Sequence, residues 1–254
     1  MLFRNVRNLT PQSLLKPNKK KGGGSLDEPL IVFTFDDAFT TDYTFAYPLL
    51  TSNGFKGTSY VATSWVGGDR FCTWEQLKEM YNSGQWDLQC HTHTHPMMGW
   101  QDEERLRYEI ETVNDTFVAQ GLPIPKHHAY PYGDTSELSI DVLNEYRLTQ
   151  RLTGAYRNHT NSRDNLINDE FGLVKGVSID TQSEDRLQLV KDVIQWGYNT
   201  RKVIVVYCHQ IVPEPTDYAY QISEHYLTEI VNFVKSLGIR SVTISEMYDE
   251  VYNS

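Results

Sequence analysis

From residue 29 onward, short runs of β-branched and aromatic residues alternate with longer segments whose apolar positions recur every three or four residues. In segment 103–120 these positions form one face of a predicted helix: Leu106, Ile110, Val113 and Phe117. A similar stripe runs through 227–234. The predicted strands are 30–35, 58–62, 86–90, 127–130, 152–156, 173–179, 203–208 and 241–244. Strands that alternate with helices are typical of a parallel sheet covered by helices.

The number of strand signals favours a closed barrel over an open sheet. We therefore predict an α/β fold, a distorted (β/α)7–8 barrel. In such barrels the reactive side chains lie at the carboxyl ends of strands. Asp36 and Asp37 end the first predicted strand, His91 follows the third, and His209 follows the seventh. The pattern thus predicts one site made of residues that are far apart in the sequence.

The chain divides near residue 28. Residues 1–28 are predicted to be an N-terminal extension, and the run 16–25 is rich in lysine and glycine, which is typical of a solvated linker. Residues 29–254 are predicted to form a single catalytic domain.

Composition narrows the class of protein. The 254 residues are 39% hydrophobic, which is enough for a large core. The net charge of −10 argues against nucleic acid or anionic lipid as a partner. We expect no membrane span, since no run approaches about eighteen apolar residues, and no signal peptide, so the chain is expected to be soluble. The three cysteines form neither a Cys-x-x-Cys pair nor a disulfide framework.

Two short motifs supply ligands for a divalent metal. Asp36 and Asp37 offer carboxylates, and His91 and His95 lie on one face of the segment whether it is helical or extended. One carboxylate can bind the metal while its neighbour accepts a proton from an activated water. His93 is assigned to the supporting scaffold. This combination suits Zn and its first-row neighbours and predicts a metal-dependent hydrolase.

Four motifs together resemble a known family. They are Thr34-Phe35-Asp36-Asp37, His91-Thr92-His93-Thr94-His95, Tyr130-Pro131-Tyr132-Gly133 and Val206-Tyr207-Cys208-His209. Their order and spacing resemble those of the NodB-like polysaccharide deacetylases, carbohydrate esterase family 4. The resemblance covers residue 29 to the C-terminus. It implies a NodB-type barrel that binds one divalent metal and removes acetyl groups from N-acetylated or O-acetylated sugars.

The resemblance also implies a metal site. Asp37, His91 and His95 match the metal-binding triad of the family. Zn is the expected ion, with Co, Ni, Fe or Mn as alternatives. The implied partner is an acetylated polysaccharide or oligosaccharide. By analogy with the family, the protein would work outside the cell or in the cell envelope, and otherwise in the cytoplasm.

Three further residues match catalytic positions of the family. Asp36 matches the general base, and His209 matches the general acid that protonates the leaving group. Tyr132 holds the position whose backbone N–H helps to stabilise the oxyanion.

The sequence departs from the family pattern at several positions. The arginine-containing run usual before Pro131 is replaced by 126–130, which holds no arginine to orient Asp36. Ala38 stands where glycine is usual. Asp180 is a candidate for the fourth family motif, and alternatively it caps the next helix.

Two alternatives to a glycan deacetylase follow from the sequence. One is an amidase that acts on a small amide without a sugar, built on the same scaffold. The other is a catalytically silent carbohydrate-binding homologue, which the missing arginine would allow.

Overall fold

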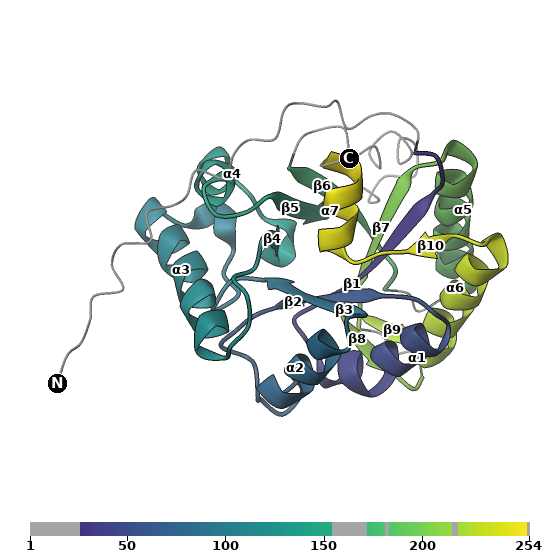
Figure 1. Cartoon of the computed structure of the whole chain (residues 1–254), viewed down its shortest axis with the longest axis horizontal. Coiled ribbons are helices and arrows are strands. Elements are labelled where there is room, and N and C mark those ends of the chain that lie inside the picture. Colours follow the sequence, from purple (N-terminus) through teal and green to yellow (C-terminus); the bar gives the residue numbers. More distant parts are fainter. Residues whose placement is uncertain (1–25, 154–171, 181–182, 215–217, 253–254) are drawn as a thin grey trace.

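The described part of the chain is built around a ring of parallel strands. The computed structural model describes residues 26–153, 172–180, 183–214 and 218–252. Seven strands pair in sequence order, and the seventh pairs with the first to close a barrel (Figure 1). They are β1 (Leu30–Asp36), β2 (Gly57–Val61), β3 (Trp86–Cys90), β4 (His127–Ala129), β5 (Thr149–Thr153), β6 (Leu173–Ser178) and β7 (Val203–Cys208). The predicted α/β fold of distorted (β/α)7–8 type is confirmed.

The pairing between strands is uneven, which distorts the barrel. β1 and β7 pair along their lengths, from Leu30 with Val203 to Phe35 with Cys208. β3 instead meets β4 at the single pair of Cys90 and His128. A short strand, β10 (Arg240–Ser241), pairs with the first residues of β1. The barrel is therefore firmly closed at the β1–β7 seam and only loosely paired between β3 and β4.

Helices cover the outside of the barrel, and short helical turns lie in the loops that connect its strands. They are η1 (Asp42–Ala46), α1 (Tyr47–Ser52), α2 (Trp74–Asn82), η2 (Met98–Trp100), α3 (Glu103–Ala119), η3 (Pro131–Gly133), α4 (Glu137–Asn144), α5 (Glu184–Thr200) and α6 (Glu224–Leu237). A small parallel pair, β8 (Gln210–Val212) and β9 (Gln221–Ser223), precedes α6. The predicted apolar stripe of α3 is fully buried in the main core, which confirms that helix. None of the helices described has the length and apolar character needed to cross a membrane.

The last helix, α7 (Ile244–Tyr252), packs against the apolar inner side chains of the barrel. Leu30 and Val32 of β1 and Val205 of β7 form a buried cluster with Met247 and Tyr248 of α7. In the view of Figure 1, α7, in yellow, overlaps the space enclosed by the strands. Because alternate residues of a strand share a face, the polar end of β1 continues this inner face toward the opposite end of the barrel. One end of the barrel is thus filled by apolar packing, and the carboxyl ends of the strands hold polar groups.

Two predicted strands differ from those observed. The prediction of a strand over 241–244 is wrong after Ser241. There the Thr243 side chain accepts a hydrogen bond from the Glu246 N–H while the Glu246 carboxylate accepts one from the Thr243 N–H, and this capping box starts α7. The strand predicted over 152–156 begins earlier, at Thr149, because pairing with β4 starts there. Residues 154–156 lie outside the described residues.

The chain just before β1 also contacts the barrel. The Leu26 N–H donates to the Arg201 carbonyl oxygen at 3.1 Å, and Arg240 Nε donates to Glu28 Oε1 at 2.8 Å. Residues 1–25 lie outside the described residues, so the predicted division at residues 28 and 29 stays a prediction.

Candidate active site at the carboxyl end of the barrel

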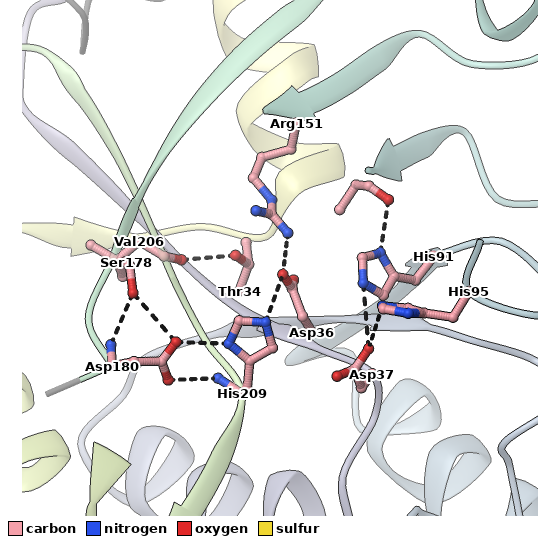
Figure 2. A network of polar contacts seen from close by, with 11 residues as sticks. Thr34, Asp36, Asp37, His91, His95, Arg151, Ser178, Asp180, Val206 and His209 are labelled. Atoms are coloured by element: carbon pink, nitrogen blue, oxygen red, sulfur yellow. Dashed lines mark hydrogen bonds and ion pairs between the residues drawn. The ribbon is translucent and has the colours of Figure 1, made fainter. Parts of the chain in front are cut away.

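Asp36 and Asp37 both face the carboxyl end of the barrel, although neighbours on a strand normally point in opposite directions. β1 ends at Asp36, and Asp37 has a φ of 76°, in the left-handed region. The chain therefore turns between the two carboxylates and brings both to one place (Figure 2). Non-glycine residues rarely adopt this conformation, and where it occurs it is concentrated at functional sites.

Asp37 lies against two imidazoles. Asp37 Oδ1 is 3.4 Å from His91 Nε2 and 3.2 Å from His95 Nε2. One ligand atom from each of the three residues falls within 4.8 Å of the others. The predicted metal ligands are therefore brought together, although they come from the ends of β1 and β3 and from the loop that follows β3.

The two imidazoles present the nitrogen that a metal needs. His91 Nδ1 lies 2.7 Å from the Ala129 carbonyl oxygen, which orients the ring so that Nε2 points toward Asp37 (Figure 2). Burial lowers the pKa of His91 to about 4, so the ring is neutral at pH 7 and keeps a lone pair. Burial alone would raise the pKa of Asp37, but contact with His95 and the charges of His91 and His95 lower it below its ordinary value.

This donor set fits a divalent cation. Asp37 Oδ1 is buried and has no hydrogen-bond partner among the described residues, although two ring nitrogens face it. An unpaired buried carboxylate oxygen is costly unless a cation compensates it. One carboxylate and two imidazoles are ligands typical of catalytic Zn and of related first-row ions.

Asp36 is held by an arginine from the other side of the barrel. Arg151 of β5 donates a hydrogen bond from Nη2 to Asp36 Oδ2, and both side chains are buried (Figure 2). The guanidinium lies between two aromatic rings, 5.5 Å from the centre of Tyr60 and 4.4 Å from that of Tyr207. Asp36 Oδ1 has no hydrogen-bond partner within the described part of the chain.

A glycine leaves room for this arginine. A Cβ added to Gly176 of β6 would lie 2.8 Å from Arg151 Cδ and 3.0 Å from a ring carbon of Tyr207. A larger residue at position 176 would therefore force Arg151 or Tyr207 to shift.

His209 faces Asp36 and is paired with Asp180. His209 Nδ1 lies 2.7 Å from Asp180 Oδ2, and the His209 N–H donates to Asp180 Oδ1 at 3.0 Å. The other ring nitrogen, Nε2, lies 3.8 Å from Asp36 Oδ2. Burial would lower the pKa of His209, but the charge and hydrogen bond of Asp180 outweigh it and, with Asp36 and Asp37, raise the pKa to about 9. His209 is therefore protonated at neutral pH.

Tyr132 stands in a tight turn over the metal-binding residues. Its φ of 59° is left-handed, and its ring centre lies 4.7 Å from that of His95. The next residue, Gly133, also has a positive φ, and a Cβ there would come within 2.2 Å of Thr153 Oγ1. The Pro-Tyr-Gly turn thus depends on glycine at this position.

A cavity of about 1040 Å³ lies over this centre, and its lining residues include Asp36, Asp37, His91, His95, Tyr132, Asp180 and His209. On the side of His95, the rings of Trp65, Phe71 and Phe39 pack in series, and Trp65 lies 4.5 Å from His95 between ring centres. On the side of His209, Tyr220 lies 5.2 Å from the imidazole and contacts Tyr218. The cavity therefore has aromatic walls on both sides of the polar centre.

The structure brings together all six predicted site residues and adds Arg151, which sequence reasoning missed. The predicted strand over 152–156 began one residue too late to include it. A charged residue inside a β-rich run was the available signal. Asp180, a candidate from the sequence, lies against His209. His93 Nδ1 contacts Thr63 Oγ1 at 2.8 Å, which agrees with its assignment to the scaffold.

The sequence matches a family model and several curated proteins that are named as deacetylases of polysaccharides. The family model described as polysaccharide deacetylase matches residues 23–150, about half of the chain. A poly-beta-1,6-N-acetyl-D-glucosamine N-deacetylase from Staphylococcus aureus (strain MRSA252) is 27% identical over 138 residues. That match covers 49% of this chain and 47% of the relative. The chain thus spans about half the length of the curated relatives it matches.

Solved structures share the fold. The Xyl-CE4 domain of a multidomain xylanase, from the hindgut metagenome of Trinervitermes trinervoides, superposes with a TM-score of 0.61 at 17% identity, covering 88% of this chain and 91% of that domain. A CE4 family pseudoenzyme from Bacillus anthracis superposes with a TM-score of 0.59 at 14% identity, covering 88% of this chain and 66% of that protein. At these identities the likeness concerns the fold.

Proposed function

The chain belongs to the polysaccharide deacetylase family, and from that premise we propose that it is a metal-dependent hydrolase that removes acetyl groups from an acetylated glycan. The observation that carries the proposal is the arrangement of Asp36 between two groups (Figure 2). On one side lies the triad of Asp37, His91 and His95, and on the other lies His209. A carboxylate, a set of metal ligands and a protonated imidazole are the parts that amide hydrolysis needs.

Asp37, His91 and His95 would hold the metal, with Zn as the proposed ion. When bound, a divalent cation would polarise the acetyl carbonyl and lower the pKa of the attacking water. The low pKa of His91 keeps its imidazole neutral, as a metal ligand must be.

Asp36 is proposed as the general base. A water attacks the acetyl carbonyl carbon, and Asp36 Oδ1, which has no hydrogen-bond partner among the residues described, accepts its proton. Arg151 holds the other oxygen and fixes the direction of the carboxylate. The backbone N–H of Tyr132 is proposed to stabilise the oxyanion that forms.

His209 is proposed as the general acid. Breaking the C–N bond of an amide requires a proton on the leaving nitrogen, because an amine anion is a very poor leaving group. His209 carries that proton at neutral pH, since Asp180 raises its pKa to about 9. The products are acetate and a sugar with a free amine, or with a free hydroxyl when the substrate is an ester.

A sugar chain is the proposed substrate. Pyranose rings have apolar faces that pack on aromatic side chains, and the cavity presents such walls beside both His95 and His209. The S. aureus relative is named for poly-beta-1,6-N-acetyl-D-glucosamine, and we propose a glycan that contains N-acetylglucosamine here as well. Such a substrate would place the activity at the cell envelope or outside the cell.

Arg151 favours an active deacetylase over the alternative of a catalytically silent carbohydrate-binding homologue. A silent binding protein was an alternative because the family arginine is missing before Pro131. The Arg151 guanidinium supplies a cation to the same carboxylate from β5. This contact supports a working base.

The proposal is tested by acetate release. The protein would be stripped of metal with a chelator, and acetate would be measured after addition of Zn, Co or Ni. The substrates would be oligomers of β-1,6- and β-1,4-linked N-acetylglucosamine, together with acetylated xylan. We expect release that depends on added metal and is larger for one of the N-acetylglucosamine oligomers. Absence of release from every substrate with every metal would refute the proposed function.

A further inference from the structure

Glu109 of α3 is a fully buried acid that the catalytic scheme does not use; its exposed fraction is 0%. Its carboxylate contacts the loop between His91 and His95. Glu109 Oε2 accepts hydrogen bonds from the N–H groups of His93, at 2.8 Å, and Thr94, at 2.7 Å. Oε1 accepts one from the Thr94 hydroxyl at 2.6 Å and lies 2.6 Å from Arg105 Nη2.

The loop that Glu109 holds has an unfavourable backbone conformation. Thr92 has a φ of 68° and His95 a φ of 61°, both in the left-handed region. Residues other than glycine adopt this conformation only where surrounding contacts enforce it. Two such residues within four positions let the chain turn so that the Nε2 atoms of His91 and His95 both face Asp37.

The loop is fixed from two opposite sides. On the side of β2, the carbonyl oxygens of Thr92 and His93 accept hydrogen bonds from the N–H groups of Thr63, at 3.3 Å, and Ser64, at 3.0 Å. On the side of α3, Glu109 holds the N–H groups of His93 and Thr94. The residues after β2 thus hold the carbonyl groups of the loop, and α3 holds its N–H groups. Together these hydrogen bonds fix the peptide planes between the two metal-binding histidines.

Stability alone is a weak reason for a buried acid at this position. Removing a carboxylate from water is costly, and its partner Arg105 is 41% exposed and so offers a partly screened charge. The hydrogen bonds of Glu109 to the loop between His91 and His95 give a better reason, because this loop carries two of the proposed metal ligands.

We propose that Glu109 is a positioning residue for the metal centre, holding the His91–His95 loop in the conformation that directs both imidazoles at one ion. This inference rests on the proposed function only in that Asp37, His91 and His95 bind the metal. Residues that do not touch the metal but orient its ligands typically contribute about 10–100-fold to metal affinity.

The test is the Zn affinity of Glu109→Gln, measured by competition with a chromophoric chelator on folded protein. We expect affinity to fall about tenfold or more, because a Gln amide would place an N–H group against Thr94 and Arg105. Hydrogen exchange at the His93 and Thr94 amides should also become faster. The matched control is Glu104→Gln, which removes the same charge from an exposed position of α3 and should bind Zn like the parent.

A purely structural role predicts something different. It would lower the melting temperature of the metal-free protein and leave the Zn affinity of the folded molecules unchanged, and that result would overturn the inference. If Glu109→Gln does not fold, Thr94→Val decides, since it removes one donor to Glu109 and keeps the acid. A smaller but measurable loss of Zn affinity in Thr94→Val supports the proposal, and parental affinity contradicts it.

These measurements need no substrate. If the parent binds Zn and releases no acetate, but Glu109→Gln binds Zn more weakly than the parent, the proposed function fails and the role of Glu109 stands. If the parent releases acetate and Glu109→Gln binds Zn as the parent does, the role of Glu109 fails alone.

Discussion

The guanidinium of Arg151 donates a hydrogen bond to Asp36, although the two residues lie 115 positions apart in the chain. Closure of the barrel brings β5 opposite β1, and Gly176 leaves the space through which the arginine reaches. Tyr60 and Tyr207 hold the guanidinium from two faces. The direction of the Asp36 carboxylate is therefore set by a residue outside the motifs that identify the family.

Replacing Arg151 with lysine should impair turnover without removing the metal. An ammonium on a flexible stem cannot reproduce the planar guanidinium between two rings, so Asp36 would lose its fixed direction. A small misplacement of a reacting group can cost about 100-fold in rate, and we expect a fall in kcat of that order. Acetate release and metal content would be measured on the same sample.

The control for this variant is Arg107→Lys, at a surface ion pair with Glu103 and Glu145. It makes the same chemical change away from the cavity and should keep the parental kcat. Parental turnover in Arg151→Lys would show that Asp36 does not need the arginine.

Replacing Asp180 with asparagine should change the pH profile. The Asp180 carboxylate is the main reason that the pKa of His209 is raised to about 9. With His209 as the proposed acid, activity is retained below this pKa and lost as pH rises through it. Without the charge of Asp180 the pKa falls, and the alkaline limb of kcat against pH should move to lower pH. An alkaline limb that stays in place would exclude His209 as the acid.

Replacing His91 with alanine should abolish metal binding and activity together. One of three protein ligands is lost, and the contact with the Ala129 carbonyl that orients it is lost as well. Zn added to the parent should raise its melting temperature, because a ligand that binds only the folded state stabilises it by about 2.7 kcal/mol at 100 times its Kd. The melting temperature of His91→Ala should not respond to Zn. Parental metal content in this variant would contradict the assignment.

Replacing Tyr220 with alanine should weaken the binding of long substrates. Tyr220 is 47% exposed and lines the cavity beside His209, where it can pack on a sugar ring. An aromatic contact of this kind is worth about 0.5–1.5 kcal/mol, so we expect KM for an oligosaccharide to rise about 2- to 13-fold. The control is Tyr198→Ala, at a similarly exposed tyrosine on α5. Equal KM values for the two variants would argue against a sugar site at Tyr220.

Many of the helices and strands could be predicted from the sequence, because they depend on the local spacing of apolar residues. The buried stripe of α3 and the apolar runs of β1 and β7 depend on the spacing of neighbouring residues, which periodicity reports. The positions of Asp36, His91 and His209 at strand ends then follow from the barrel. The end of β10 was missed because the capping box of Thr243 and Glu246 outweighs the β-branched composition of 241–244.

Other features depend on contacts between distant residues. Arg151 reaches Asp36 only because β5 and β1 face each other across the barrel, and no local pattern marks that pairing. The left-handed backbone at Asp37 aligns two carboxylates that strand geometry alone would separate. The link between Glu109 and the His91–His95 loop likewise joins a helix to a loop through side-chain contacts.

The most direct test of the central claim is acetate release by Asp36→Asn, with metal content determined on the same preparation. Asparagine keeps the shape of the side chain but cannot accept the proton, and removal of a general base typically costs about 10²–10⁴-fold in rate. We predict that Asp36→Asn keeps parental Zn content, since Asp37, His91 and His95 are unchanged, and loses acetate release by that factor. Parental acetate release from the metal-loaded Asp36→Asn protein would contradict the account.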